Sequence, residues 1–261
     1  MSYTTLKLDY DAAIATITLD RPDKRNAISS QMIDDLLAAL DDVEKNAAAR
    51  VLIITGAGKA FCAGMDLDGL RSIASQSQLE NLKDSRQMAK MFHRIYAFPK
   101  PTIAAVNGAA IAGGCGIATL ADFTLAAPEA KFGYTEVKIG FIPALVSVFL
   151  RRQIGDKQSR DLLLTGRIVE AAEAHRLGLI TELVPADKLA ARARELAASL
   201  LDTSPTSLAN TKRLLLQQDE VALQTDLERA IHANAEIRAT PDFREGLASF
   251  LEKRDPKWTK P

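Results

Sequence analysis

Cysteine and aromatic residues are scarce in this chain of 261 residues, and neither sign of charge is in excess. The two cysteines, Cys62 and Cys115, stand in no CxxC motif and no Cys/His ligand spacing, so we expect reduced, partly buried thiols and no metal site. Lysine plus arginine and aspartate plus glutamate both number 33, and aromatic residues make up only 5%. This balance argues against nucleic acid as a partner, because such binding surfaces are rich in positive charge.

Long apolar runs are missing as well. No stretch approaches the ~18 consecutive apolar residues of a membrane span, and the N-terminal segment lacks a basic region followed by an apolar one. We therefore expect no membrane partner and a cytoplasmic location. What the chain does have is 47% hydrophobic residues, which is enough to bury a large core.

In the first 150 residues, short apolar runs alternate with patterns typical of helices. After Ser29 or Ser30, both good N-caps, the apolar residues from Met32 to Val43 fall on one helical stripe. A polar helical region follows at 71–95, and its first part, rich in serine and glutamine, is expected to be a loose loop. Apolar runs predict strands at 13–19, 51–55, 101–106 and 122–126. The alternation favours an α/β fold with parallel strands.

The second half of the chain is mainly helical. Residues 159–180 predict two helices joined by a short link, and residues 181–184 predict one late strand. Beyond about residue 186, segments rich in alanine, leucine, glutamate and arginine predict three or four further helices. We therefore divide the chain into a core at 1–200 and a C-terminal helical region at 201–261.

Two glycine-containing turns follow predicted strands. The first, GAGKAFCAGMDLDGL at 56–70, does not fit a dinucleotide site, because Phe61 stands where G-x-G-x-x-G needs its third glycine. The second turn contains Gly113 and Gly114 and leads into a helical run, whose first N–H groups are unpaired. Each turn alone is better explained by close packing. Two such turns on neighbouring strands, however, can aim one N–H each at a single point, as an oxyanion hole does.

Longer segments of the sequence resemble the crotonase family, the enoyl-CoA hydratases and isomerases. The matching segments follow the order of the family and span nearly the whole chain: RPDKRNAIS, GKAFCAGMDL, PTIAAVNGAAIAGGCGIATLADFTLAAPEAKFGYTEVKIGFIP, LLLTGRIVEAAEAHRLGLITELV and SFLEKR. The resemblance implies a crotonase-like spiral of ββα units and a C-terminal helical trimerisation region that covers the CoA site. It also implies a homotrimer or hexamer, an acyl-CoA thioester as substrate, and no cofactor apart from the coenzyme A of the substrate.

The resemblance also implies roles for particular residues. The backbone N–H groups of Met65 and Gly113 correspond to the oxyanion donors of the family. Ala63 and Leu67 correspond to main-chain contacts with the adenine and pantetheine of CoA. Lys24 and Arg25 correspond to basic residues that contact the CoA phosphates. Phe250 and Lys253 correspond to a C-terminal pair that contacts the CoA nucleotide of a neighbouring subunit.

The acid–base residues depart from the family pattern. Typical hydratases carry two glutamates that face each other across the substrate; the first corresponds to Gly116 here and the second to Glu136. A positioned acid or base contributes typically ~10²–10⁴-fold, so the chain should be a poor standard hydratase. One carboxylate is enough to move a proton from C2 to C4 of a 3-enoyl thioester. We therefore prefer double-bond isomerisation, with Glu136 as the catalytic base.

Several alternatives stay open at this point. One is a 2-enoyl-CoA hydratase, a lyase, in which another group replaces the missing glutamate at position 116. Another is a non-catalytic acyl-CoA-binding protein, and decarboxylation or thioester hydrolysis could use the same turns. The acyl group itself cannot be deduced. Phe141, Ile142 and Leu145 are candidates for shaping its pocket, although core packing explains them equally well.

Overall fold

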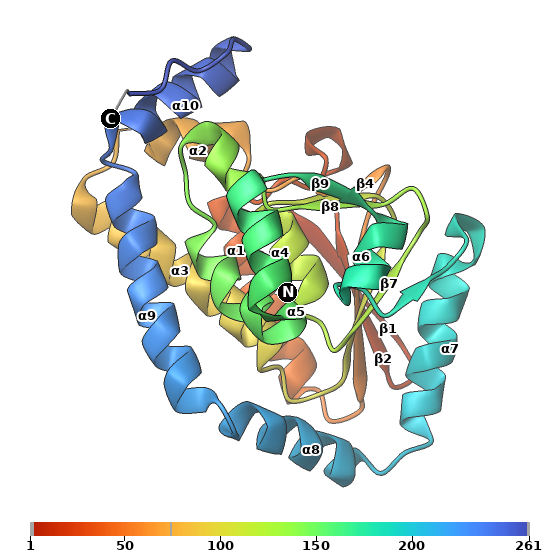
Figure 1. The fold of residues 1–261 in the computed structure, drawn as a ribbon. Helices are drawn as coiled ribbons and strands as arrows, with labels where there is room; N and C mark the ends of the chain where they lie inside the picture. The colour runs from red at the N-terminus through yellow and green to blue at the C-terminus, as the bar shows by residue number, and fades with distance from the viewer. Residues whose placement is uncertain (1–2, 74, 260–261) are drawn as a thin grey trace.

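Two β-sheets form the centre of the computed structural model, which describes residues 3–73 and 75–259 (Figure 1). The larger sheet has the order β1-β2-β3-β5-β7-β10: β1 (Leu6–Asp11), β2 (Ile14–Leu19), β3 (Val51–Gly56), β5 (Thr102–Val106), β7 (Phe123–Ala126) and β10 (Glu182–Leu183). The smaller sheet has the order β4-β6-β8-β9: β4 (Ala60–Cys62), β6 (Ala109–Ile111), β8 (Lys131–Gly133) and β9 (Ile168–Glu170). The β1–β2 and β8–β9 pairs are antiparallel, and the other pairs are parallel.

Helices connect and cover these sheets. In chain order they are α1 (Ser30–Lys45), α2 (Leu67–Ile73), α3 (Gln78–Tyr96), α4 (Gly113–Thr119), α5 (Ala144–Thr165), α6 (Ala171–Leu177), α7 (Leu189–Leu201), α8 (Pro205–Gln217), α9 (Glu220–Ile237) and α10 (Pro241–Glu252). Short 3₁₀ helices add η1 (Pro22–Lys24), η2 (Glu136–Ile139) and η3 (Ala186–Lys188).

From β3 to β8, consecutive strands alternate between the two sheets. The strand pairs β3–β4, β5–β6 and β7–β8 each place their first strand in the larger sheet and their second in the smaller one, and each pair is followed by helix. This repeat is the ββα spiral that the family resemblance predicts. Its consequence for the site is that the ends of β4, β6 and β8 come out side by side in one small sheet.

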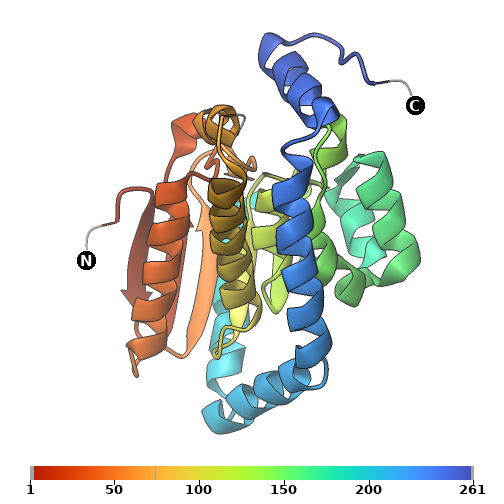
Figure 2. The same ribbon diagram turned by 90° about the vertical axis from the view of Figure 1, so that its left-hand side faces the viewer.

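The core lies on both faces of the larger sheet. Along β3, Leu52 and Ile54 join the main core, whereas Val51 and Ile53 join a second cluster beneath α7, as the alternation of a strand requires. On the main-core side, α3 contacts both α1 and α9, and α9 also contacts α5 (Figure 2). This helical layer forms one wall of the cavity described below.

Most predicted elements are confirmed. Ser29 caps α1 and its side chain accepts a hydrogen bond from the Met32 N–H at 3.2 Å. The five predicted strands appear as β2, β3, β5, β7 and β10, and the C-terminal part holds α7, α8, α9 and α10. The division near residue 200 stays a prediction; it falls close to the end of α7 and the start of α8.

Two predictions are wrong in detail. The first part of 71–95 is not a loose loop throughout: α2 continues to Ile73, and α3 begins at Gln78, where Ser77 and Glu80 form a capping box. The link predicted inside 159–180 contains the strand β9. The strands of the small sheet are missing from the prediction, because three residues each carry no readable period. No helix within 3–73 or 75–259 combines the length and apolar character that crossing a bilayer requires.

Candidate active site

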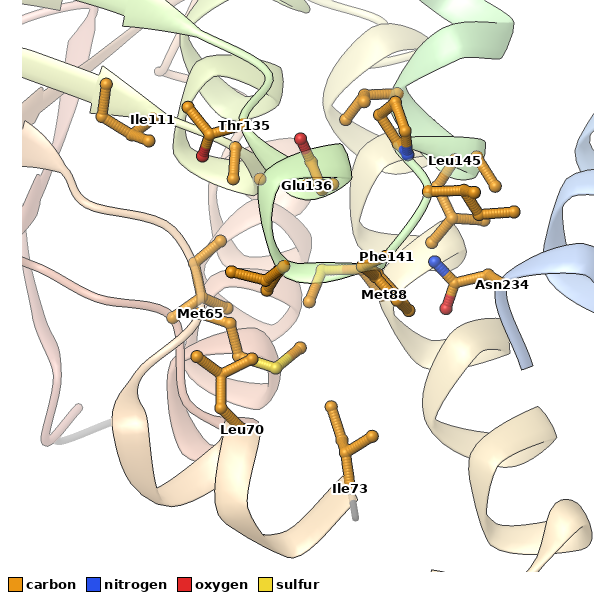
Figure 3. Close-up of a pocket in the computed structure, with 18 of the residues that line it drawn as sticks. Met65, Leu70, Ile73, Met88, Ile111, Thr135, Glu136, Phe141, Leu145 and Asn234 are labelled. Carbon is orange, nitrogen blue, oxygen red and sulfur yellow. The ribbon is translucent and has the colours of Figure 1, made fainter. Parts of the chain in front are cut away.

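A cavity of about 230 Å³ is lined by residues from both glycine turns, η2 and the helices α3, α5, α9 and α10 (Figure 3). Most of the lining side chains are apolar. Polar side chains come from four positions, Thr135, Glu136, Asn234 and Arg238. An apolar cavity with a few converging polar groups is the usual form of a small-molecule site.

The first glycine turn presents the N–H of Met65. Around this residue, Ile28 N–H donates to the Gly64 carbonyl at 2.7 Å and Asp66 N–H donates to the Ile28 carbonyl at 3.0 Å. These two hydrogen bonds join the chain on either side of Met65 to Ile28 and do not involve the Met65 N–H. That N–H has no acceptor in the described part of the chain. Since Met65 lines the cavity, a backbone donor is available at its edge.

The second turn presents the N–H of Gly113, the first residue of α4. Ala112 precedes it with φ 49° and ψ −124°, a conformation that side chains rarely adopt. Strain of this kind is commonly retained where it orients a functional group. In residues 3–73 and 75–259 the Gly113 N–H has no acceptor, and Gly113 lines the same cavity as Met65.

The two turns pack directly on each other. Gly64 has φ +87°, and a Cβ there would lie 3.0 Å from the Ile111 carbonyl oxygen. A Cβ on Gly114 would lie 2.2 Å from the Cys62 carbonyl oxygen. Only glycine permits both approaches. The structure therefore brings Met65 and Gly113 to one cavity, as the sequence predicts.

Buried polar contacts fix the first turn in place. The Arg21 guanidinium pairs with Asp66 at 3.1 Å, and the other oxygen of Asp66 accepts from the Gly69 N–H at 2.8 Å. Asn26 is fully buried, and its amide donates to the carbonyls of Ala57 and Ala60 at 2.9 and 2.8 Å. These contacts give the Met65 N–H a rigid support. No local sequence pattern indicates these contacts.

Glu136 lies at the start of η2, directly after β8. Its Oε2 is out of contact with solvent and has no hydrogen-bond partner among the described residues. Burial raises the pKa of this carboxyl from 4.5 to about 7, and a backbone hydrogen bond offsets part of the rise. Figure 3 shows Glu136 between the side of the cavity that carries Met65 and the side that carries Asn234.

Position 116 is closed by apolar side chains. Gly116 is buried in α4, and a Cβ there would lie 2.9 Å from Val146 Cγ1 and 3.1 Å from Phe92 Cε1. Both neighbours line the cavity, whereas Gly116 does not. The space that the family resemblance assigns to a first carboxylate is therefore filled with hydrocarbon.

The residues predicted to contact CoA lie around the cavity or on the surface. Ala63 lines the cavity, and its N–H donates to the Arg25 carbonyl at 3.0 Å. Phe250 lines the cavity of its own chain from α10 and is 49% exposed. The others are exposed at three places, Lys24 beside Arg25, Leu67 at the start of α2, and Lys253 at the end of α10.

The cavity wall includes all three residues that the sequence offered as candidates for shaping the pocket, Phe141, Ile142 and Leu145. It missed Asn234 and Arg238, which reach the cavity from α9. The available signal was their i, i+4 spacing on the buried face of that helix.

Both cysteines are free and fully buried, and burial raises the pKa of each thiol to about 12. Neither lines the cavity. In residues 3–73 and 75–259 no group of three potential ligand side chains could hold a metal ion.

Comparison with known proteins agrees with this architecture. The family model described as enoyl-CoA hydratase/isomerase matches residues 9–261. A Thermus thermophilus protein, whose name assigns it provisionally to the enoyl-CoA hydratases, is 46% identical over 94% of this chain and 97% of its own. The 2,3-dehydroadipyl-CoA hydratase of Escherichia coli is 34% identical over 93% of this chain and 94% of its own.

Solved structures show the same fold. An enoyl-CoA hydratase/isomerase from Xanthobacter autotrophicus superposes with a TM-score of 0.90 at 30% identity, covering 99% of this chain and 100% of that one. The ββα spiral and its cavity thus define a crotonase-fold enzyme whose class of substrate is an acyl-CoA thioester. The chain belongs to the enoyl-CoA hydratase/isomerase family.

Proposed function

We propose that the protein isomerises a 3-enoyl-CoA thioester to the 2-enoyl isomer, with Glu136 as the only acid–base group. One observation carries this proposal: Glu136 is the sole carboxylate among the described residues that line the cavity. Val146 and Phe92 occupy the place of a second one. A single carboxylate can complete a proton shift, whereas hydration uses a positioned water molecule as well.

The proposed reaction begins with the thioester oxygen accepting hydrogen bonds from the N–H groups of Met65 and Gly113. Ionised Glu136 removes a proton from C2, and the electrons of that C–H bond move into a dienolate whose charge rests on the thioester oxygen. Protonated Glu136 then returns the proton at C4, and the double bond ends between C2 and C3. Losing one such backbone donor typically costs ~2.7–4 kcal/mol of transition-state stabilisation.

The electrostatics of Glu136 support the role of base. A carboxyl with a pKa of about 7 is half ionised near neutral pH, and it is far more basic than an exposed glutamate. The apolar wall around it provides the desolvation that produces this shift. The same wall excludes water from the dienolate, which favours isomerisation over hydration.

The CoA part of the substrate would lie at the exposed side of the cavity. Ala63 lines the cavity, and its direct hydrogen bond to the Arg25 carbonyl places Arg25 and Lys24 next to the site. Phe250 lines the cavity from α10, and Lys253 caps the C-terminal end of that helix. Exposed cations of this kind suit phosphate groups.

The names of the relatives favour a second candidate, hydration of a 2-enoyl-CoA ester. In this cavity the water would have to be held without a second carboxylate. The test is to supply the purified protein with matched 3-enoyl-CoA and 2-enoyl-CoA esters. We expect conversion of the 3-enoyl ester to exceed hydration about 10²-fold. Faster hydration would overturn the isomerase proposal, and tight binding with no turnover of either ester would indicate a binding protein.

We also propose that the chain assembles into a homotrimer or hexamer. Leu214 and Leu215 on α8 are 57% and 62% exposed, and Val221 at the start of α9 is 84% exposed. Large apolar side chains exposed on two consecutive helices are candidates for an interface. Light scattering should give three or six times the mass of one chain, and a monomer at all concentrations would contradict this.

A further inference from the structure

The helix α9 places two buried polar side chains in the cavity wall, one helical turn apart. Asn234 is 5% exposed and Arg238 is 4% exposed, and both line the cavity. Burying polar groups beside hydrocarbon is unfavourable unless they find hydrogen-bond partners. The hydrogen-bond partners of these two residues therefore show which of their donors and acceptors remain free for a ligand.

The amide of Asn234 can have only one orientation. Its Oδ1 accepts from an Arg238 terminal N–H at 2.9 Å and lies 2.8 Å from the Ser85 hydroxyl. A guanidinium has donors only, so the amide oxygen, not the nitrogen, must face Arg238. The Nδ2 group consequently points the other way, and Figure 3 shows this nitrogen directed into the cavity.

This Nδ2 group is an unused donor. Within residues 3–73 and 75–259 it has no hydrogen-bond acceptor, although the oxygen of the same amide has two neighbours. A buried amide whose oxygen is fully engaged and whose nitrogen faces an apolar cavity is suited to a ligand acceptor. Figure 3 also shows Asn234 on the side of the cavity opposite Met65, so the acceptor is not the thioester oxygen proposed to lie at Met65.

Arg238 itself positions Asn234 and does not supply a free charge. One terminal nitrogen lies 2.8 Å from Asp84 and 3.2 Å from the Asn81 side-chain oxygen, and the Nε is inaccessible. Its guanidinium carbon stands 5.7 Å from the centre of the Phe141 ring. With the cation balanced by Asp84, and with Glu136 in the same cavity, a carboxylate on the acyl group would find no compensating charge.

We propose that Asn234 is a specificity residue that donates a hydrogen bond to an uncharged oxygen on the acyl group, such as a ketone or hydroxyl. The preferred substrates are then oxygenated acyl-CoA thioesters and not plain hydrocarbon chains. This inference rests on the proposed function, because it assumes that the acyl group enters this cavity. A site built to hydrogen-bond a substrate oxygen discriminates against the analogue that lacks it, since the buried donor is then left unpaired.

Calorimetric binding of saturated esters tests the inference without any turnover. The probes are hexanoyl-CoA, 4-oxohexanoyl-CoA and 5-oxohexanoyl-CoA, titrated into the full-length protein. We expect one oxo ester to bind about fivefold to tenfold more tightly than hexanoyl-CoA, the range of one neutral hydrogen bond. Equal binding of all three esters would overturn this inference alone. Failure of every ester to bind would overturn the proposed function, and this inference with it.

Two variants separate the donor from the fold. Asn234→Asp keeps an oxygen for Arg238 but replaces the donor with an acceptor, and Asn234→Leu removes both. Each should abolish the preference for the oxo ester while hexanoyl-CoA still binds, with thermal melting as the check on folding. The control is Asn210→Asp on the exposed face of α8, which should retain the preference. A preference that survives in both Asn234 variants contradicts the assignment.

Discussion

The family resemblance assigns positions 116 and 136 to the two carboxylates of a typical hydratase, and the two positions differ sharply in this chain. At 136 a glutamate faces the cavity, one of its oxygens has no hydrogen-bond partner among the described residues, and its pKa is raised to about 7. At 116 a glycine lies under Val146 and Phe92, with no room for a further carbon atom. The missing carboxylate therefore leaves no polar gap, because hydrocarbon occupies its space.

The two positions are linked through desolvation. Val146 and Phe92 line the same cavity as Glu136 and offer it neither charge nor hydrogen bond. A second ionised carboxylate would raise the pKa of Glu136 by repulsion, whereas the apolar wall raises it by excluding solvent. Exclusion of solvent thus yields one basic carboxylate without a second carboxylate to hold water. The proposed proton shift needs only that one base.

The largest effect is expected at Glu136. Glu136→Gln removes the base and should lower kcat/KM on a 3-enoyl-CoA ester by ~10²–10⁴-fold. In the unmodified protein kcat/KM should rise with pH through about 7, because the base must be ionised. A pH series of initial rates measures both effects. Unchanged turnover in the variant would remove Glu136 from the mechanism.

The same substitution should stabilise the fold at high pH. The folded-state pKa of Glu136 is raised from 4.5 to about 7, so the native protein binds more protons in this interval and loses stability as pH rises. Above about pH 7 the loss is on the order of 3 kcal/mol, and Glu136→Gln avoids it. Below about pH 4.5 the two proteins should be equally stable.

Urea unfolding at several pH values measures this difference in the free energy of unfolding. Glu129→Gln, the same change at an exposed position, is the control and should leave the pH dependence of stability unaltered. A constant difference between Glu136→Gln and the unmodified protein at every pH would show that desolvation does not act on this carboxyl.

A smaller effect on stability and activity is expected from substitutions at position 116. Gly116→Glu must displace Val146 or Phe92 and should destabilise the protein by ~1–3 kcal/mol without adding hydration activity. Combining it with Val146→Ala makes room, so the double variant should be more stable than the sum of the single changes predicts. Only the double variant should gain hydration. A single variant as stable as the unmodified protein would refute the packing argument.

The smallest effect is expected at the second turn. Ala112→Gly relieves the strained backbone conformation at φ 49° and should stabilise the fold by ~1 kcal/mol with little change in rate. Ala109→Gly in the neighbouring strand β6 is the control, and it should destabilise by ~0.5–1 kcal/mol. If both changes destabilise the fold equally, Ala112 is not strained.

The sequence predicts the larger sheet well and the smaller one poorly, for a physical reason. Runs such as 51–55 are buried on both faces and long enough to be recognised, whereas each strand of the smaller sheet has only three residues, whose pairing depends on the neighbouring strands. The start of α3 was missed although Ser77 and Glu80 form a standard capping box. Its polar composition obscured that local signal.

For the site, the residues alone indicated the two turns, and the family resemblance supplied Glu136. Asn234 could not be predicted, because its orientation depends on Ser85, 149 positions away in the sequence, and on Arg238. The closure of position 116 likewise depends on Val146 and Phe92, which lie on different helices. Long-range contacts of this kind leave no local pattern.

The unpaired amides of Met65 and Gly113 belong to the peptide chain itself. Every residue except proline carries such an amide, so most point mutations at these two positions would leave the donors in place. The properties of Glu136 and Gly116, in contrast, depend on their side chains and change with any substitution. Under the proposed mechanism, substitutions in the cavity wall can therefore alter the reaction while the two backbone donors for the thioester oxygen are retained.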